Sequence, residues 1–318
     1  MLRPAEAGHY VLWFVTQGET AKIAVSMSTE PTARNPRPAA TVLVLRDSAE
    51  GPEIFMVRRG HGAAFMGGAY VFPGGRVDQG DAGSADESWC TGIAGASSSL
   101  AGVAAPDAVG YYVAAARELF EEAGVLVARD PAGRFVSLAD AGAHARFKQY
   151  RTDVHAGSRT LRALVEGEGL RLALDTLVPF AHWVTPPIDI RQFDTRFFVT
   201  RVPPDQSPAH DDAETVESTW IAPADAIARC RRGEIVLPPP TWTSLRELER
   251  FASVEDAIAW ARSRRIARRE PRFVDEDGRK MLLLPGDPLG PDPAGDDIPF
   301  ETRFVLSEGR WRAERPTA

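Results

Sequence analysis

Apolar and polar positions along the chain alternate in two ways, one typical of strands and one typical of helices. Two runs rich in β-branched residues, 38–46 and 53–59, are separated by a polar stretch containing Gly51, and this pattern predicts an antiparallel hairpin. Shorter apolar runs bounded by glycine or proline predict further strands at residues 69–72, 180–186, 193–199 and 220–221.

Helical spacing dominates between these strands. Apolar residues recur every three or four positions over residues 106–123, and Gly124 follows as the end of the predicted helix. Residues 139–174 carry two helical patterns with a Gly-Glu-Gly break at 167–169. Three later helices are predicted at residues 223–230, 244–251 and 253–262. The tail, residues 272–285 and 301–312, has the pattern of two hairpins joined by a linker rich in Asp, Pro and Gly.

Composition and charge narrow the function. The chain has 318 residues, of which 44% are hydrophobic, and a formal net charge of −7, which gives no electrostatic reason to expect a nucleic-acid partner. An anionic substrate would need a local basic pocket or a bridging metal.

Cys90 and Cys230 are too few for a disulfide framework, so a cytoplasmic location is expected. The apolar run 9–15 is too short to span a bilayer, and no membrane contact is expected.

Three carboxylates in one segment carry the candidate chemistry. Glu118, Glu121 and Glu122 stand at i, i+3 and i+4 of the predicted helix and therefore share one face. Such anions repel one another unless a positive group lies between them, and a hard divalent cation with oxygen ligands fits this role. The alternative for any acidic triplet is a solvated helix face.

The segment Arg117–Val125, together with Phe72–Gly75 and Asp81 upstream, resembles the Nudix box. The match is split, because 35 residues (82–116) separate Asp81 from Arg117 where the family has seven. The resemblance implies an α/β fold, a Nudix α/β/α sandwich with a mixed central sheet. We expect a disordered N-terminal extension at 1–36, of which residues 1–26 are alternatively a mis-assigned start. The Nudix domain is expected at 37–232, with insertions at about 82–108 and 139–174, and a helical and hairpin extension at 233–318.

The same resemblance assigns roles within the box. Glu118, Glu121 and Glu122 would coordinate Mg²⁺ or Mn²⁺, with the Gly75 carbonyl as a further candidate ligand. Structural roles are implied for Arg117, Gly74, Asp81 and Gly124. Asp81 and Asp78 replace the glutamates that the family usually has, which preserves charge with a shorter reach. Glu214, six residues before Trp220, is the candidate catalytic base, Glu217 is its rival, and exposed loop acids are the alternative for both.

Later motifs narrow the resemblance to the split-box subfamily that includes the peroxisomal coenzyme A diphosphatase nudix motif 19 and its bacterial relatives. They are His182–Pro186, Phe193–Phe198 and Leu237–Thr241. The resemblance implies hydrolysis of coenzyme A or acyl-coenzyme A to 3′,5′-ADP and 4′-phosphopantetheine or its acyl form. The terminal residues 316–318 are not a peroxisomal address.

Substrate contacts are less sharply indicated. A second coenzyme A signature is matched by Arg59 and Gly68, whereas Ala64 and Tyr70 replace an arginine and a methionine. Candidate substrate-binding residues are Arg59, Arg196 and Tyr70, with Arg58 and Arg191 also available and Trp183 as a stacking alternative. The alternative for each arginine is a surface or structural ion pair, and for Tyr70 and Trp183 it is the apolar core.

Two further functions stay open from the sequence. One is the same chemistry on ADP-ribose, NADH or a nucleotide sugar, and the other is a non-catalytic nucleotide sensor on a Nudix scaffold. The intact acidic set argues against the sensor, because a protein released from catalysis has no reason to keep three repelling carboxylates. The expected partner is a small-molecule nucleotide substrate, with a homodimer as an open alternative.

Overall fold

The computed structural model describes residues 10–16, 19–25, 35–60, 67–81, 85–187, 192–211, 214–292 and 299–315. Its helices are α1 (Ile93–Ser99), α2 (Ala105–Ala123), α3 (Ala141–His155), α4 (Leu161–Gly167), α5 (Pro223–Arg231), α6 (Pro239–Leu248) and α7 (Val254–Ser263), with a 3₁₀ turn η1 (Leu174–Thr176). Its strands are β1 (Tyr10–Thr16), β2 (Glu19–Val25), β3 (Arg37–Ser48), β4 (Gly51–Arg59), β5 (Tyr70–Val71), β6 (Gly74–Arg76), β7 (Cys90–Thr91), β8 (Ala128–Arg129), β9 (Arg171–Ala173), β10 (Val178–Val184), β11 (Phe193–Arg201), β12 (Thr215–Ile221), β13 (Arg268–Arg269), β14 (Arg272–Glu276), β15 (Arg279–Leu283), β16 (Arg303–Ser307) and β17 (Arg310–Glu314).

A mixed sheet forms the centre of the molecule. Its strands run in the order β12-β4-β3-β11-β10-β13, with β5 paired to β4 and β6 paired to β3. The predicted hairpin is present as β3 and β4, closed by the pair Ser48 and Gly51, and Gly51 has a φ of 115° that favours glycine. The pairs β3 with β11 and β10 with β13 are parallel, and the others in this sheet are antiparallel.

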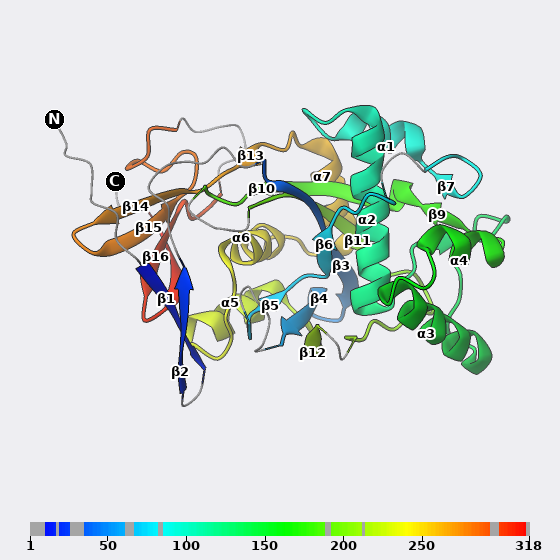
Figure 1. Ribbon diagram of the computed structural model, residues 1–318, viewed down its shortest axis with the longest axis horizontal. Helices are drawn as coiled ribbons and strands as arrows, with labels where there is room; N and C mark the ends of the chain where they lie inside the picture. The colour runs from blue at the N-terminus through cyan, green and yellow to red at the C-terminus, as the bar shows by residue number, and fades with distance from the viewer. Residues whose placement is uncertain are drawn as a thin grey trace.

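Helices cover both faces of this sheet. Successive residues of β3 point to opposite sides, so Val42 and Val44 pack in the cluster that includes α2, while Leu43 and Leu45 pack in the cluster that includes α5, α6 and α7. Figure 1 shows α2 on one side of the sheet and α5 and α6 on the other. The predicted α/β/α sandwich with a mixed central sheet is therefore confirmed.

The predicted box helix is present as α2. Pro106 lies in its first turn, where its missing N–H costs no hydrogen bond, and Gly124 ends it in the left-handed conformation with a φ of 68°. Most of α2 is buried, because a second layer packs on the side that faces away from the sheet. That layer consists of α1, α3, α4 and the small sheet β7-β9-β8 (Figure 1).

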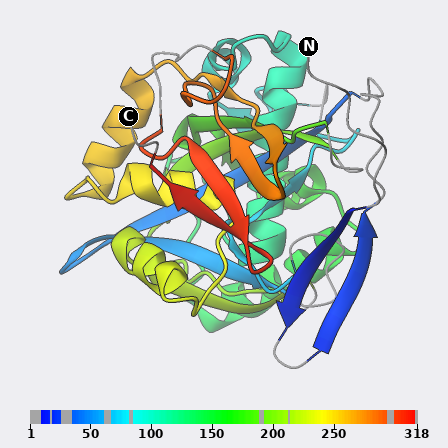
Figure 2. The same ribbon diagram turned by 90° about the vertical axis from the view of Figure 1, so that its left-hand side faces the viewer.

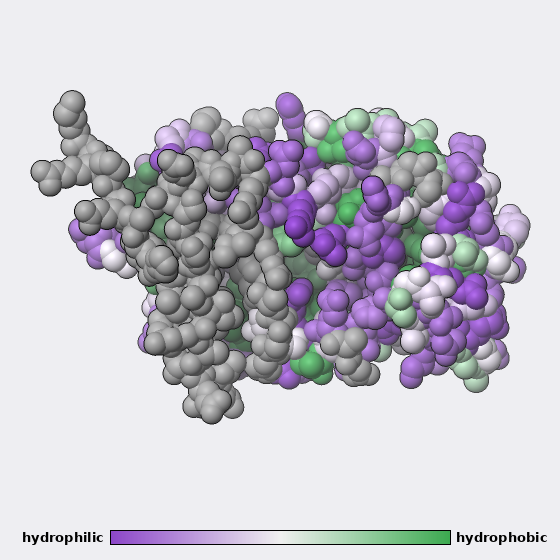
Figure 3. All heavy atoms as spheres, viewed as in Figure 1, coloured by the Kyte–Doolittle hydropathy of each residue, from purple (hydrophilic) through white to green (hydrophobic). Residues whose placement is uncertain are grey.

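Both predicted insertions contribute to the second layer. The first holds α1 and the fully buried Trp89, where the sequence suggests a loop or short helix with this tryptophan as its anchor; residues 82–84 lie outside the described residues. The second holds α3 and α4, in the range where two helices are predicted. Hydrophilic side chains gather over α3 and α4 on the molecular surface (Figure 3).

The C-terminal part adds helices and a separate sheet. The two predicted hairpins are β14-β15 and β16-β17, and they join through β15 and β16 into one four-stranded sheet (Figure 2). Helix α6 begins at Pro239, earlier than predicted, because prolines are compatible with the first turn of a helix. Among the described helices, none is both long and apolar enough to cross a bilayer.

The N-terminal segment 1–36 departs in part from the disorder that its sequence suggests. Strands β1 and β2 pair in register as an antiparallel hairpin from Tyr10 and Val25 to Thr16 and Glu19. The run Tyr10–Thr16 is rich in aromatic and β-branched residues, which favour strands. Residues 1–9, 17–18 and 26–34 lie outside the described residues.

Candidate active site

The three predicted carboxylates lie together on the last two turns of α2. Glu118 and Glu121 keep 13% and 12% of their side-chain surface exposed, and Glu122 is buried. This burial excludes the solvated helix face that the sequence left as the alternative. The carboxylates are held in a partly water-excluded site, where their mutual repulsion is stronger than at a surface.

Arg117 connects the two halves of the box. Its Nη1 donates to Oε1 of Glu118 at 2.9 Å and to Oε1 of Glu121 at 3.2 Å. Its Nη2 donates to Oδ2 of Asp81 at 2.8 Å and to the carbonyl of Arg76, also at 2.8 Å. The arginine therefore braces both the helix and the upstream loop, the role that the sequence resemblance implies.

Asp81 is a buried anchor of the loop. Its Oδ2 also accepts a hydrogen bond from the Asp78 backbone N–H at 2.8 Å, so the carboxylate closes a short turn while it pairs with Arg117. Asp78 itself is exposed and lies 3.7 Å from the guanidinium. The shorter aspartate at position 81 thus reaches its partner.

The glycines of β6 let the helix approach the sheet. The Gly74 N–H donates to Oε2 of Glu122 at 2.9 Å. A Cβ atom on Gly74 would lie 2.4 Å from the Ala40 carbonyl oxygen, and one on Gly75 would lie 2.4 Å from Oε1 of Glu118. Any side chain at either position would occupy space that the backbone or the Glu118 carboxylate already fills.

Burial raises the pKa of all three glutamates. Desolvation is the largest cause for each, and it raises the pKa of Glu118 to about 7 and that of Glu122 to about 8. The pKa of Glu121 is also raised, against the opposing charge of Arg117. Four carboxylates lie within 4 Å of the one Arg117 guanidinium, so the cluster carries an excess of negative charge.

A divalent cation would fit this cluster in chemical terms, because the donors are carboxylates and a carbonyl and the local charge is negative. In the parts of the chain that the structure describes, no three acidic, histidine or cysteine side chains already converge as metal ligands. Arg117 takes the facing oxygens of Glu118 and Glu121 instead. Metal coordination by these residues stays a prediction.

Arg59, the last residue of β4, and Glu214, which directly precedes β12, lie near the carboxylates. The negative charge of Glu214 raises the pKa of Glu122 and the positive charge of Arg59 lowers it, so both charges act on this group. The Gly60 N–H donates to the Glu214 carbonyl at 3.0 Å, which fixes the backbone while the side chain is exposed. Within the described structure, the buried Nε of Arg59 has no hydrogen-bond partner.

The rival acid and the tyrosine are engaged elsewhere. Glu217 lies 3.0 Å from Nε of Arg58. Burial and a hydrogen bond to Glu217 raise the pKa of Tyr70 to about 12. Tyr70 and Trp183 belong to the core on the α5 to α7 side of the sheet, and the structure does not bring them to the glutamates.

Arg196 lies on the α2 side, two strands away from Gly75. Arg196 pairs with Ala40 across β11 and β3, and Ala40 pairs with Gly75 across β3 and β6. Directly opposed residues point to the same face of a sheet, so Arg196 and Gly75 share the face that α2 covers. Arg191 and Ala64 lie outside the described residues.

Two residues of α3 reach the site that the sequence did not indicate. Nε of Arg151 donates to the Glu121 carbonyl at 2.7 Å, and Nδ1 of His155 lies 3.9 Å from Oε2 of Glu121. Their i, i+4 spacing on a basic helix is the one signal that places them on a common face. A Cβ on Gly124 would lie 3.1 Å from Nη1 of Arg151, so the glycine also leaves room for this contact.

Comparisons with known proteins agree with this geometry. The family described as the NUDT19 Nudix domain matches residues 93–248. The human acyl-coenzyme A diphosphatase NUDT19 is 30% identical over 281 residues, covering 76% of this chain and 73% of that protein. A nudix relative in Caenorhabditis elegans is 28% identical over 222 residues, covering 69% of this chain and 62% of that protein.

A solved structure has a similar fold over most of this chain. The crystal structure of a NUDIX hydrolase from Alicyclobacillus acidocaldarius is similar with a TM-score of 0.58 and 27% identity, covering 72% of this chain and 97% of that one. The split box, the buried carboxylates braced by Arg117, and the identity to NUDT19 over most of both chains lead to one conclusion. This chain is a Nudix hydrolase and belongs to the NUDT19 family.

Proposed function

We propose that the chain hydrolyses the phosphoanhydride bond of coenzyme A or an acyl-coenzyme A. The products would be 3′,5′-ADP and 4′-phosphopantetheine or its acyl form. The observation that carries this proposal is the 30% identity, over 76% of the chain, to a human relative named an acyl-coenzyme A diphosphatase. The buried carboxylate cluster on α2 supports the reaction class, because diphosphate hydrolysis needs a site that manages concentrated negative charge.

We further propose that Glu118, Glu121, Glu122 and the Gly75 carbonyl hold Mg²⁺ or Mn²⁺. The excess of negative charge around Arg117 and the raised pKa of the glutamates support this assignment. A bound divalent ion would neutralise the diphosphate and lower the pKa of the attacking water. Arg117, held by Asp81, would keep the carboxylates oriented.

In the proposed reaction one water molecule is consumed. Its oxygen forms a bond to one phosphorus, the bridging oxygen leaves with the other phosphate, and a base accepts the proton. Glu214 is favoured over Glu217 as this base because the charge of Glu214 acts on Glu122, whereas Glu217 pairs with Arg58. Arg59, whose Nε is buried, is proposed to contact the substrate phosphates.

A substrate panel tests the proposed function. Coenzyme A, acetyl-coenzyme A, NADH, ADP-ribose and UDP-glucose are each incubated with the protein and Mg²⁺, and the products are identified by mass spectrometry. Cleavage of the coenzyme A species to 3′,5′-ADP is expected. Cleavage of ADP-ribose, NADH or UDP-glucose alone would contradict the proposed substrate, and no turnover of any compound would favour a nucleotide sensor.

Substitution of the glutamates tests the site itself. Glu121→Gln and Glu122→Gln each remove one anionic ligand, so we expect kcat/KM to fall by about 100-fold or more with the fold retained. The matched control is Glu166→Gln on the exposed face of α4. Equal turnover with excess chelator and with Mg²⁺ would refute the proposed metal site.

We also propose that the enzyme acts in the cytoplasm on small-molecule substrates. The two cysteines and the acidic net charge support this proposal. Imaging of a tagged copy tests it, and a punctate distribution would speak against it.

A further inference from the structure

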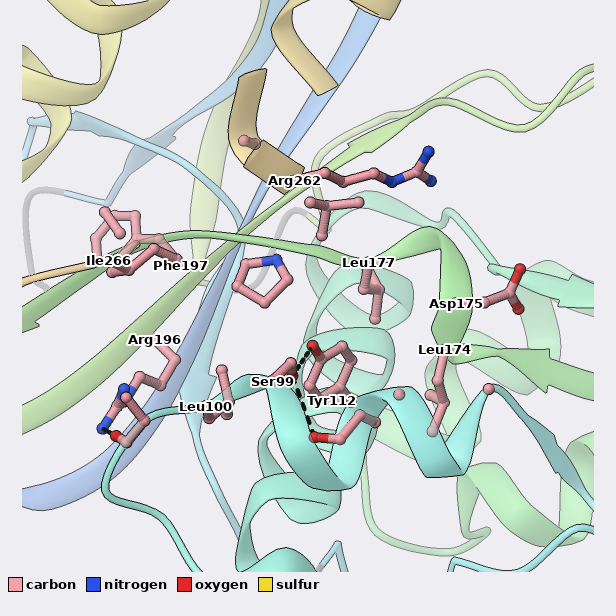
Figure 4. Close-up of a pocket in the computed structure, with 18 of the residues that line it drawn as sticks. Ser99, Leu100, Tyr112, Leu174, Asp175, Leu177, Arg196, Phe197, Arg262 and Ile266 are labelled. Carbon is pink, nitrogen blue, oxygen red and sulfur yellow. Dashed lines mark hydrogen bonds between the residues drawn. The ribbon is translucent and has the colours of Figure 1, made fainter. Parts of the chain in front are cut away.

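A cavity of about 550 Å³ lies beside β10 (Figure 4), and none of the three glutamates lines it. Among the described strands, β13 pairs with β10 only at His182 and Trp183, so the first half of β10 is an edge there. The pairing of β10 with β11 is interrupted by a bulge between Pro179 and Ala181. Helix α1 and η1 border the cavity on one side, and the residues from Ala261 to Ile266 border it on the other. The volume is in the range of small-molecule sites.

The cavity wall is mostly apolar. Its larger apolar side chains are Leu100, Leu174, Leu177, Phe197 and Ile266. Small residues of α1 and its N-cap, among them Gly92, Gly95 and Ala96, leave the space open. The hydroxyl groups of Ser99 and Tyr112 lie 2.5 Å apart and satisfy each other, as Figure 4 shows, so this wall needs no polar ligand.

Helix α1 and residues 261–266 complete a space whose remaining wall comes from α2, η1, β10 and β11. Helix α1 belongs to the insertion within the box, and residues 261–266 belong to the C-terminal extension. The sandwich that carries the carboxylates therefore does not form the cavity by itself. The cavity is a candidate for substrate selection rather than for the chemical step.

Arg196 connects the cavity to the catalytic cluster. It lines the cavity, and the register places it on the α2 face two strand spacings, roughly 10 Å, from Gly75. Its side chain is 8% exposed, its Nε lies 3.5 Å from Oδ1 of Asp194, and its Nη2 donates to the Ala101 carbonyl at 3.4 Å. Arg262 and Arg265 add positive charge at the exposed rim.

We propose that this cavity holds the acylated end of a coenzyme A thioester whose diphosphate lies at Glu118 and Gly75. This inference rests on the proposed function. A thioester of this kind joins an anionic diphosphate to an apolar chain through a long arm, and the structure offers a charged cluster, a buried arginine and an apolar cavity in that order. Gly95 then determines how long an acyl chain the enzyme accepts.

Gly95 permits a direct test. A Cβ at this position would meet nothing within 4 Å, and its φ is not in the left-handed region, so a side chain can be added without backbone strain. Gly95→Phe places a large apolar side chain at the cavity wall. Ala94→Phe is the matched control, because Ala94 is the neighbouring exposed residue of α1 and does not line the cavity.

The measurement is kcat/KM for acetyl-, butyryl-, octanoyl- and dodecanoyl-coenzyme A. Each methylene buried in the cavity is worth up to about fourfold, so the wild-type octanoyl to acetyl ratio should exceed about tenfold. Gly95→Phe should reduce that ratio at least about tenfold, whereas Ala94→Phe should keep it. A general loss of activity would lower kcat/KM for octanoyl- and acetyl-coenzyme A alike and leave their ratio unchanged.

Two results separate this inference from the function on which it rests. If the wild type cleaves these thioesters but shows no chain-length preference, or if Gly95→Phe preserves it, the cavity assignment is wrong and the proposed function stands. If the wild type cleaves none of them, the proposed function itself is wrong. Should Gly95→Phe fail to fold, Gly95→Leu replaces it, with a smaller reduction of the ratio expected and an unchanged ratio overturning the assignment.

Discussion

At the scale of single residues, the site depends on two glycines without side chains as much as on the charged side chains around them. Gly74 and Gly75 have no side chain because the Ala40 carbonyl and the Glu118 carboxylate occupy the space. Arg117 then meets the carboxylates of both box halves. The spacing of Glu118, Glu121 and Glu122 is readable in the sequence, but their burial and raised pKa are not.

The glycines permit a graded prediction. Gly74→Ala forces a Cβ against backbone, which cannot move cheaply, so we expect a loss of about 1–3 kcal/mol of stability. Gly75→Ala meets the movable end of the Glu118 side chain, so activity should fall more than stability. Gly80→Ala is the control, since nothing lies within 4 Å of its Cβ. Thermal unfolding and kcat/KM measure both effects, and equal melting temperatures for Gly74→Ala and Gly80→Ala would contradict the close approach.

The raised pKa values predict how stability depends on pH. In the metal-free protein, Glu118 and Glu122 retain their protons up to a pKa of about 7 and about 8, whereas the unfolded chain loses them near about 4.3. Their contribution to stability is therefore complete below the unfolded value and is lost as the pH rises through the folded values, at about 1.4 kcal/mol per pKa unit. The melting temperature in chelator should fall between about pH 5 and pH 8.

Glu122→Gln tests whether the buried glutamates cause this fall in melting temperature, because the amide does not titrate. The decline should be smaller in this variant, and Mg²⁺ should reduce it in the wild type if the carboxylates bind the ion. Thermal unfolding in chelator measures this pH dependence. If the melting temperature falls equally in the wild type and the variant, other groups cause the fall.

At the scale of elements, α2 is supported from both sides. Its sheet-facing side packs on β3, and α3 from the second insertion covers its C-terminal end. Arg151 places a cation at the carbonyl of Glu121, where the helix dipole is negative. The insertion therefore supports the C-terminal end of α2.

Removal of this contact should loosen the end of α2. Arg151→Ala leaves the Glu121 carbonyl without its charged donor, and we expect a loss of about 1–3 kcal/mol together with lower kcat. Lys148→Ala, on the exposed side of the same helix, should change neither. Amide hydrogen exchange at residues 119–124 provides the readout, and unchanged protection there would refute the supporting role.

The sequence predicted the individual helices and strands better than the contacts between them. The hairpin of β3 and β4, the helix α2 and its glycine end follow from local periodicity and turn chemistry, and all are present. Arg151 and His155 were missed because nothing in the local pattern of α3 indicates which face meets Glu121. Tyr70 stands at a position of the coenzyme A signature, where it replaces a methionine, and its side chain lies on the opposite face of the sheet from α2.

At the scale of the whole molecule, the C-terminal extension is bound to the sheet by buried charge. Oε1 of Glu247 on α6 accepts a hydrogen bond from Nη2 of Arg269 on β13 at 2.6 Å and lies 3.6 Å from Nη1 of Arg264. Strand β13 is the edge of the central sheet, and the preceding segment borders the cavity. These ion pairs therefore join α6 to β13, the edge strand of the central sheet, and to Arg264, which lines the cavity.

Breaking this cluster should be costly. Glu247→Gln removes the charge that compensates buried Arg269, so we expect a loss of about 3–5 kcal/mol. Glu255→Gln, at an exposed position of α7, should cost less than about 1 kcal/mol. Denaturant unfolding compares the two, and similar midpoints would mean that the buried pair contributes little to stability.

The sequence by itself determined the three carboxylates on one helix face, the glycines around them and the family to which the chain belongs. These features depend on the spacing of residues within a short segment. The regular geometry of a helix or strand converts that spacing directly into relative position. Only the tertiary structure decided that Arg117 closes the gap to Asp81, that α3 reaches Glu121, and that α1 and residues 261–266 border a common cavity. Those contacts join segments far apart in the chain, and they form because burying apolar surface brings whole elements together, which no local pattern records.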